Sequence, residues 1–357
     1  MKKSLPLILF AVMLLMSGCL KKEAKTDRPI DNSSSEIVGQ DETAAQEPAD
    51  SDQYTNLFPL TGIATNDDTE HRAIAVMINN HPKARPQSGL SKADIVYEMY
   101  AEAEVTRFLA VYQSEMPQEV GPVRSARDYF IKLAKGLDCV YVCHGNSPDA
   151  KEMLDQGYID HLNGLQYDGT LFKRSSERKA PHNSYITFEN IELGSQQNSY
   201  DLTEKPKPFT FLEKSEMEHL QGEPASSVQI SYGSSLFDVE FSYDEQSETY
   251  SRYSNNQQTI EYKDETPIKI DNIFIIEAPH KVIDRVGRRD IDLKVGGKAY
   301  LLQKGKWNEI QWENSEGRII PMENGKEVGL VPGKTWVNVL PDKPGISQLV
   351  QLGVQEN

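Results

Sequence analysis

Two arginines, Arg124 and Arg127, offer the most specific chemistry in the sequence. Both lie in Gly121-Pro-Val-Arg-Ser-Ala-Arg127, at the start of a helix predicted over residues 125–137. A cation at a helix N-terminus opposes the helix dipole, whereas the free backbone N–H groups there attract anions. Because a guanidinium pairs bidentately with carboxylate or phosphate, two arginines at this position predict an anionic partner.

The sequence leaves open where that anion comes from. Carboxylates of the same chain could take the place, and the candidates are Asp94, Glu98, Glu102 and Glu104. An external ligand is the second, less favoured alternative. Structural ion pairs are commoner than ligand sites, but both arrangements perturb ionisable groups in the same way.

Further polar residues lie in loops that follow predicted strands. Ligands of open α/β sheets bind outside the carboxyl ends of the strands, so these loops could converge on one site. The candidate ligand-binding residues are Arg85, Glu98, Arg107, Arg124, Arg127, His144, His182 and Asn183. The two histidines adjoin turn-forming residues, where a histidine is more often a structural hydrogen-bonding group than a base.

No recognised catalytic motif accompanies these residues. The sequence has no Walker loop, no GxGxxG, no HExxH and no Gly-x-Ser-x-Gly. Trp307, Trp312 and Trp336 are interpreted as core residues. We therefore predict no catalytic residue, no cofactor and no metal site, and the sequence leaves open whether the protein is an enzyme.

The elements that must position these residues alternate between strand and helix in the first half. Apolar runs predict strands over residues 74–78, 93–97 and 105–113. Ser125 is the expected N-cap of the first helix, and Ser147-Pro148 is expected to open the next one. The alternation favours an α/β domain over residues 54–205.

A linker rich in proline and charge is predicted over residues 206–226, and the remainder, 227–357, is expected to be β-rich and mostly antiparallel. The overall fold class is therefore α+β, an α/β domain followed by a β-rich one. The expected strands of the second domain are residues 228–232, 239–243, 250–253, 273–277, 299–302 and 336–340.

Cys139 and Cys143 lie in one apolar run that is typical of a buried strand. Four residues along a strand separate their Cα atoms by about 13 Å, whereas a disulfide needs about 7 Å or less. A metal site from Cys143 and His144 is disfavoured, because neighbours on a strand face opposite ways. Two buried, unreactive thiols are expected.

The N-terminus has the three parts of a secretory signal: Lys2 and Lys3, an apolar run too short to span a bilayer, and Ser17-Gly18 before Cys19. Met16-Ser-Gly-Cys19 resembles the bacterial lipobox, although Leu is usual where Met16 stands. The resemblance implies a lipid on Cys19, with residues 1–19 as the lipoprotein signal. Residues 20–53 are polar and acidic, which predicts a disordered tether that reaches roughly 30 Å.

The charge balance restricts the possible partners. The net charge is −16; without Lys2 and Lys3, 36 basic and 54 acidic residues leave −18. Such a chain is a poor candidate for nucleic-acid binding or for adhesion to anionic lipid, both of which rely on basic surfaces. The expected partners are the cell membrane, through the anchor on its extracytoplasmic face, and an anionic ligand or a protein. The sequence does not predict the oligomeric state.

The same residues resemble the YerB-like lipoproteins of bacteria. The similarity lies in four long stretches of the first half and in two stretches of the second. They are Asn79 to Ile95, Thr106 to Ala110, Gly121 to Arg127 and Ala180 to Asn183, followed by Gly287 to Asp292 and Val331 to Trp336. The resemblance covers nearly all of the chain after the tether. It implies a membrane-anchored, two-domain protein and leaves the chemistry open.

A second resemblance supplies an enzyme alternative. Ala93-Asp94, Arg107 and the loop from Val120 to Arg127 are similar to the LytR-CpsA-Psr group. That similarity implies transfer of a glycopolymer from a lipid pyrophosphate, with Asp94 as a metal ligand. The group's Arg-Ser-Asp and Pro-Arg-Asp motifs are absent in that form. Three hypotheses thus stand: a non-catalytic binding protein, an envelope phosphotransferase, and a structural protein whose arginines pair internally.

Overall fold

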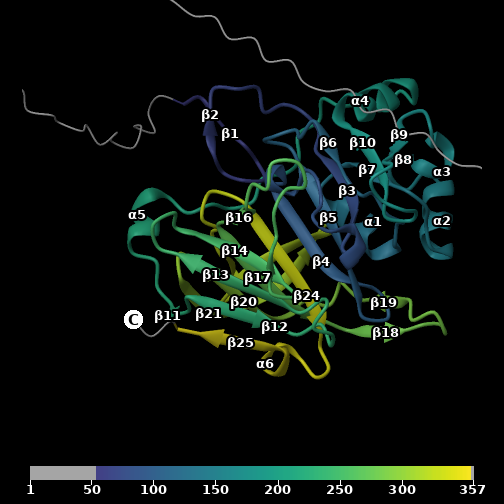
Figure 1. Ribbon diagram of the computed structural model, residues 1–357. Helices are drawn as coiled ribbons and strands as arrows, with labels where there is room; N and C mark the ends of the chain where they lie inside the picture. The colour runs from purple at the N-terminus through teal and green to yellow at the C-terminus, as the bar shows by residue number, and fades with distance from the viewer. Residues whose placement is uncertain (1–53, 355–357) are drawn as a thin grey trace, which may run out of the picture. The chain divides into compact units, whose positions relative to one another are not determined.

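A long mixed β-sheet joins both halves of residues 54–354, the part of the chain that the computed structural model describes (Figure 1). The expected signal, Cys19 and the tether lie outside these residues. The first half contributes β3 (Ile74–Asn79), β4 (Ile95–Glu102), β5 (Val105–Tyr112), β7 (Val140–Cys143) and β8 (His161–Asn163). The second contributes β11 (Glu223–Pro224), β17 (Asn272–Ala278), β20 (Gly297–Gln303), β21 (Lys306–Ser315), β22 (Arg318–Glu323), β23 (Lys326–Glu327) and β24 (Thr335–Pro341).

The two halves meet where β24 pairs in parallel with β4, from Thr335 opposite Ile95 to Asn338 opposite Glu98. Within the described residues the strand order is β23-β22-β21-β20-β17-β24-β4-β5-β3-β7-β8, and β11 pairs with β21. Figure 1 shows the yellow β24 beside the blue β4. The last strand of the chain is thus inserted beside one of the first.

A second, antiparallel sheet covers this junction. It contains β12 (Ser227–Ile230), β13 (Val239–Asp244), β14 (Thr249–Ser254), β15 (Gln257–Gln258), β16 (Lys269–Ile270) and β25 (Val350–Gly353). Its inner face buries Phe241, whose ring lies 6.3 Å from that of Trp336, and Trp336 in turn lies 5.1 Å from Phe108. Each aromatic side chain removed from water in this way contributes about 1.5–3 kcal/mol.

The helices are short and cluster in the first half. They are α1 (Asp128–Gly136), α2 (Pro148–Asp155), α3 (Gly164–Tyr167), α4 (Phe188–Gln197), α5 (Lys214–Glu218), α6 (Ile346–Leu349) and the 3-10 turns η2 (Pro82–Ala84) and η3 (Leu90–Lys92). The remaining strands are β1 (Asn56–Leu57), β2 (Ala64–Thr65), β6 (Glu119–Val120), β9 (Phe172–Arg174), β10 (Ser184–Thr187), β18 (His280–Val282) and β19 (Arg289–Ile291). None of the described helices is long and apolar enough to cross a membrane.

Several expectations can now be compared with the structure. Strands account for 42% and helices for 15%, so the protein is β-rich, while the α/β class of residues 54–205 stays a prediction. Ser147 caps α2 and Pro148 opens it, as predicted. The expected start of the preceding helix is wrong, because α1 begins at Asp128 with Arg127 at its N-cap. Ser125 cannot cap it, since its hydroxyl donates to His144 O at 3.1 Å.

The prediction for the two cysteines is confirmed. Cys139 and Cys143 are fully buried and free. Burial raises the pKa of both thiols far above the ordinary range, so neither forms a thiolate at neutral pH.

Candidate anion-binding site

An extended segment, residues 121–127, brings the predicted site residues together. It runs between the ends of β3 and β7 and beside β10. Its backbone hydrogen bonds are Arg124 N to Met77 O (2.8 Å), His144 N to Arg124 O (2.9 Å) and Val123 N to Ser184 O (2.7 Å). Arg124 is therefore held at the place where β3 and β7 end, as the carboxyl-end rule for ligand sites requires.

Arg107 and Arg127 have an internal partner, Glu102. Arg107 donates to the Glu102 carboxylate at 2.7 and 3.0 Å and to Ser125 O at 2.7 Å. Arg127 forms an ion pair with the same carboxylate and donates to Ala126 O at 2.6 Å. Both arginines are buried, and burial lowers the pKa of Arg107 to about 10. The anionic partner of these two arginines is therefore a carboxylate of the same chain.

Glu98 lies elsewhere, in the junction between the halves. It is fully buried and accepts hydrogen bonds from Arg252 at 2.9 Å and from Trp336 Nε1 at 3.1 Å. Thr106 Oγ1 donates to it at 3.0 Å. Arg252 follows Glu98 by 154 positions, and no local pattern identifies it as the partner. Glu98 joins the two halves and does not face a ligand.

Arg85 belongs to the surroundings of that same ion pair. Its Nε donates to Asn80 O and Oδ1 at 3.1 and 2.9 Å, and its guanidinium lies over the Phe237 ring. Burial, followed by the charge of Arg252, lowers the pKa of Arg85 to about 10. The structure therefore separates Arg85 and Glu98 from the other predicted site residues.

Arg124 differs from all of these arginines. Among residues 54–354 its guanidinium has no carboxylate and no hydrogen-bond acceptor, although the side chain is half-buried. Burial, and then the charges of Arg107 and Arg174, lower the pKa of Arg124 to about 10. The residue is still a cation at neutral pH, held in surroundings that disfavour its charge.

His144 is fixed as a neutral ring next to Arg124. Arg174 can only donate, so the 2.8 Å contact of its guanidinium with His144 Nε2 makes Nε2 an acceptor. The proton then lies on Nδ1, which donates to Ser184 Oγ at 2.7 Å. Burial and the charge of Arg174 lower the pKa of His144, in agreement with this tautomer. Arg174 is held in place mainly by Asp168, which accepts from it at 2.9 and 3.1 Å, and also by Asn183, which accepts at 3.3 Å.

His81 and His182 form a stacked pair, with ring centroids 4.5 Å apart. His81 Nδ1 accepts from Lys83 N at 3.1 Å, and His182 Nδ1 accepts from the Asn79 amide at 2.9 Å. With each Nδ1 used as an acceptor, each neutral ring carries its proton on Nε2. Neither Nε2 has a partner among the described residues. Both rings are left with an unused donor.

Every described charge that acts on this pair is positive. The pKa of His81 is lowered by burial and then by Lys83, Arg85 and Arg124. The pKa of His182 is lowered by burial and then by His81, Arg124, Lys83 and Arg178. We call His81, Lys83, Arg124, His144, Arg174 and His182 the basic cluster; Asp168 is the carboxylate beside it, 2.9 Å from Arg174 and 4.0 Å from His144 Nε2. In a chain of net charge −16, this local excess of cations favours an anion.

The structure shows which residues of the site could be predicted from the sequence and which were missed. Arg124, His144, His182 and Asn183 were predicted from their loops and do lie together. His81 and Arg174 were not selected, although His81 lies in a polar loop of the same kind and Arg174 is the last residue of β9. Among the described residues there is no group of three or more His, Cys, Asp or Glu that could hold a metal ion.

Comparison with known proteins defines the class first. Residues 60–201 match the N-terminal domain of a family described as "Protein of unknown function (DUF3048)", and residues 228–337 match its C-terminal domain. This chain is therefore a DUF3048 protein in which both matched regions contribute to one sheet.

Individual relatives identify the family more closely. The chain is 47% identical over 290 residues to "Putative lipoprotein YerB" of Bacillus subtilis, which covers 80% of this chain and 86% of the relative. The crystal structure of YerB from Bacillus subtilis matches with a TM-score of 0.77 and 44% identity, over 84% of this chain and all of that chain. The chain belongs to the YerB-like lipoprotein family, as its motifs predict.

Proposed function

We propose that the protein is a non-catalytic binding protein, anchored through Cys19 on the extracytoplasmic face of the cell membrane, that holds a phosphoryl group at the basic cluster. One observation carries the proposal. Arg124 Nη, His81 Nε2 and His182 Nε2 are donors without acceptors among the described residues, and the charge of Arg124 acts on both histidines. These three side chains are partly exposed, so a ligand can reach the donors and supply the oxygens that they lack.

The chemistry of the donors favours phosphate over carboxylate. A guanidinium and two imidazole N–H groups on separate elements can address the three oxygens of a phosphoryl group, whereas a carboxylate has two. Lys83 adds positive charge without being needed for direct contact, whereas the charge of Arg174 is balanced by Asp168, which lies 2.9 Å from it. A macromolecular partner that presents a phosphoryl group would satisfy the same donors.

The enzyme alternative gains nothing from the geometry of Asp94. Its carboxylate is fully buried and accepts from Gln113 N at 2.6 Å, from Ser114 N at 2.8 Å and from the Ser114 hydroxyl. A carboxylate that accepts three hydrogen bonds from the residues directly after β5 has little capacity left for a metal ion. Asp94 also belongs to the opposite end of β4 from Glu102, which pairs with the arginines.

Calorimetric titration of the mature chain, with Cys19→Ser, tests the anion site. Inorganic pyrophosphate and phosphate serve as probes, and citrate serves as the carboxylate comparison. We expect Arg124→Ala to weaken pyrophosphate binding about ten-fold or more, since hydrogen bonds to charged groups contribute roughly 1.5–3 kcal/mol. Arg285→Ala is the matched control, because Arg285 is exposed and has no partner among the described residues.

Two results would contradict the proposal. Binding that is equal in Arg124→Ala and Arg285→Ala would show a nonspecific charge effect. The absence of saturable binding by wild type would remove the site itself. The anchor is tested separately with a labelled fatty acid, whose incorporation should be lost in Cys19→Ala.

A further inference from the structure

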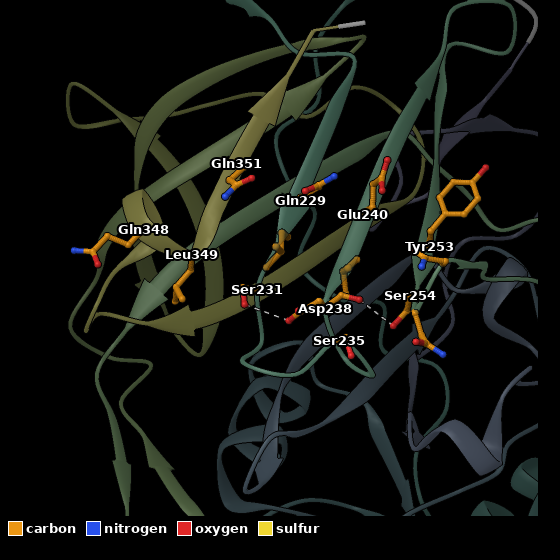
Figure 2. A pocket seen from close by; sticks show the side chains of 14 residues that line it. Gln229, Ser231, Ser235, Asp238, Glu240, Tyr253, Ser254, Gln348, Leu349 and Gln351 are labelled. Carbon is orange, nitrogen blue, oxygen red and sulfur yellow. Dashed lines mark hydrogen bonds between the residues drawn. The ribbon is translucent and has the colours of Figure 1, made fainter.

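A groove of about 400 Å³ lies on the outer face of the second sheet, away from the basic cluster (Figure 2). Its floor is formed by β25, β12, β13 and β14. The inner face of this sheet packs Val228, Ile230, Val239 and Phe241 into the core. The alternate residues of the same strands point outward and line the groove, together with parts of Ile230, Val239 and Leu349.

Four of these outward residues form one straight row across the strands. Gln351 is opposite Gln229, Gln229 is opposite Glu240, and Glu240 is opposite Tyr253. Figure 2 shows the four side chains next to one another in this order. Neighbouring strands are about 4.8 Å apart, so the row extends over roughly 14 Å. Such a length suits a chain-like ligand.

The row is unusual because its polar groups are unused. No side chain of the four makes a hydrogen bond or ion pair with another described residue. A sheet surface that only faces water commonly carries cross-strand pairs of opposite charge. This sheet has such a pair elsewhere, Lys269 of β16 with Asp244 of β13 at 3.8 Å. The groove has none.

The walls of the groove are polar and ordered. Asp238 accepts from Ser231 Oγ at 3.2 Å and from Tyr232 N at 2.7 Å, which closes the loop between β12 and β13. Asn255 and Asn256, at the turn after β14, line the groove at the same edge of the sheet, since Val239 is opposite Ser254. The loop and the turn hold the rim in place without occupying the floor.

The lining contains two carboxylates, Asp238 and Glu240, and no lysine or arginine. An anionic ligand is therefore disfavoured. Glutamine amides both donate and accept, a carboxylate accepts, and tyrosine offers a hydroxyl with an apolar ring face. A sugar has the complementary set, since each hydroxyl donates and accepts and the C–H faces are apolar. An N-acetyl group adds an amide that pairs with a glutamine amide.

We infer that this groove binds an uncharged glycan chain of N-acetylated amino sugars. Gln351, Gln229 and Glu240 hydrogen-bond successive hydroxyl and acetamido groups, and the Tyr253 ring lies against a C–H face. This site uses a different sheet and different chemistry from the basic cluster. It requires only that the described part of the chain meets glycans outside the cell.

Titration of the Cys19→Ser mature chain with the β-1,4-linked tetramer of N-acetylglucosamine tests the inference, with cellotetraose as the comparison that lacks acetamido groups. We expect saturable binding of the first tetramer, at least about five-fold tighter than cellotetraose. Gln229→Ala and Glu240→Ala should each weaken it about ten-fold, since each removes a ligand hydrogen bond and no internal one. Tyr253→Phe should change it by less than about two-fold, because the ring is retained.

Gln311→Ala is the matched control, an exposed glutamine on β21 whose loss should leave binding unchanged. Unchanged unfolding midpoints in all variants would exclude misfolding as the cause. No saturable binding at millimolar tetramer would overturn the inference, and so would equal affinity in wild type and Gln229→Ala. Cellotetraose binding as tight as the acetylated tetramer would overturn the amino-sugar assignment.

Discussion

Two arginine-containing regions of this protein use the same side chain in opposite ways. At the junction of the halves, Arg252 is 1% exposed and Glu98 is 0% exposed, and their ion pair is completed by Trp336. In the basic cluster, Arg124 is half-buried and has no anion among the described residues. The first region supplies its own counter-charge and joins two halves of a sheet. The second lacks one, and we propose that a ligand supplies it.

The comparison also shows that an arginine's environment, not its position in a motif, decides its role. Arg124 and Arg127 are three residues apart in one motif. Arg127 shares Glu102 with Arg107, whereas Arg124 has no carboxylate among the described residues and its charge lowers the pKa of His81 and His182. Both sequence-based alternatives, an internal ion pair and an external anion, therefore have a place in the molecule, the second as a proposal.

The largest effect is expected from breaking the buried pair. Glu98→Gln leaves the Arg252 charge uncompensated in the core, so the free energy of unfolding should fall by about 3–5 kcal/mol. Urea denaturation followed by circular dichroism measures it. Glu309→Gln, which removes an exposed partner of Lys298, is the control and should cost less than about 1 kcal/mol. Equal stability of the two variants would contradict the structural role of Glu98.

Replacing both members of that pair sharpens the comparison. Glu98→Leu with Arg252→Met removes both charges together, and such replacements are often neutral in other proteins. The double variant should be more stable than Glu98→Gln alone. A double variant less stable than either single variant would show that the two residues do not act as a pair.

A smaller loss is expected from Glu102→Ala, which leaves Arg107 and Arg127 without their shared carboxylate. Glu102 is 22% exposed, so water screens part of the effect, and we expect about 2 kcal/mol in the same denaturation experiment. An unfolding midpoint of Glu102→Ala equal to that of wild type would show that the pairing of Arg107 and Arg127 with Glu102 does not stabilise the fold.

The smallest predicted effect is the pH dependence of anion binding. The pKa values of His81 and His182 are lowered, so both rings are neutral at pH 7. Protonation of the two rings at lower pH adds positive charge to the site. The affinity for sulfate, which stays dianionic, should therefore rise as pH falls. We expect about a three- to ten-fold increase between pH 7.5 and 5. The increase should disappear in the His81→Gln, His182→Gln double variant, and sulfate affinity independent of pH in wild type would contradict it.

Local patterns predicted much of the fold. The runs of branched apolar residues at 74–78 and 273–277 are strands, and Ser147-Pro148 starts a helix. The charged alternation of β21 was not selected, because only Ile310 and Trp312 of its central residues are buried. The Ser125 cap failed because the hydroxyl bonds to a residue 19 positions away. Short-range rules cannot detect such competition.

The residues of the site could be predicted from the sequence to a similar extent. Loop composition selected Arg124, His144 and His182, but Arg85 and Glu98 satisfied the same criteria. Their separation depends on Arg252, a residue of the second half that reaches Glu98 only because β24 pairs with β4. The Nε2 donors of His81 and His182 are unused because the Nδ1 atoms accept from Lys83 N and from the Asn79 amide. The sequence does not show these contacts.

The most direct test of the proposed anion site combines stability and binding in one experiment. Urea denaturation of wild type and Arg124→Ala is measured with and without pyrophosphate at about 100 times its wild-type Kd. The two proteins should have the same stability without ligand, within about 0.5 kcal/mol, because Arg124 has no partner to lose. Pyrophosphate should stabilise wild type by about 2.7 kcal/mol and Arg124→Ala by about half of that or less. A large loss of stability in Arg124→Ala without ligand, or equal stabilisation of both proteins by pyrophosphate, would contradict the account.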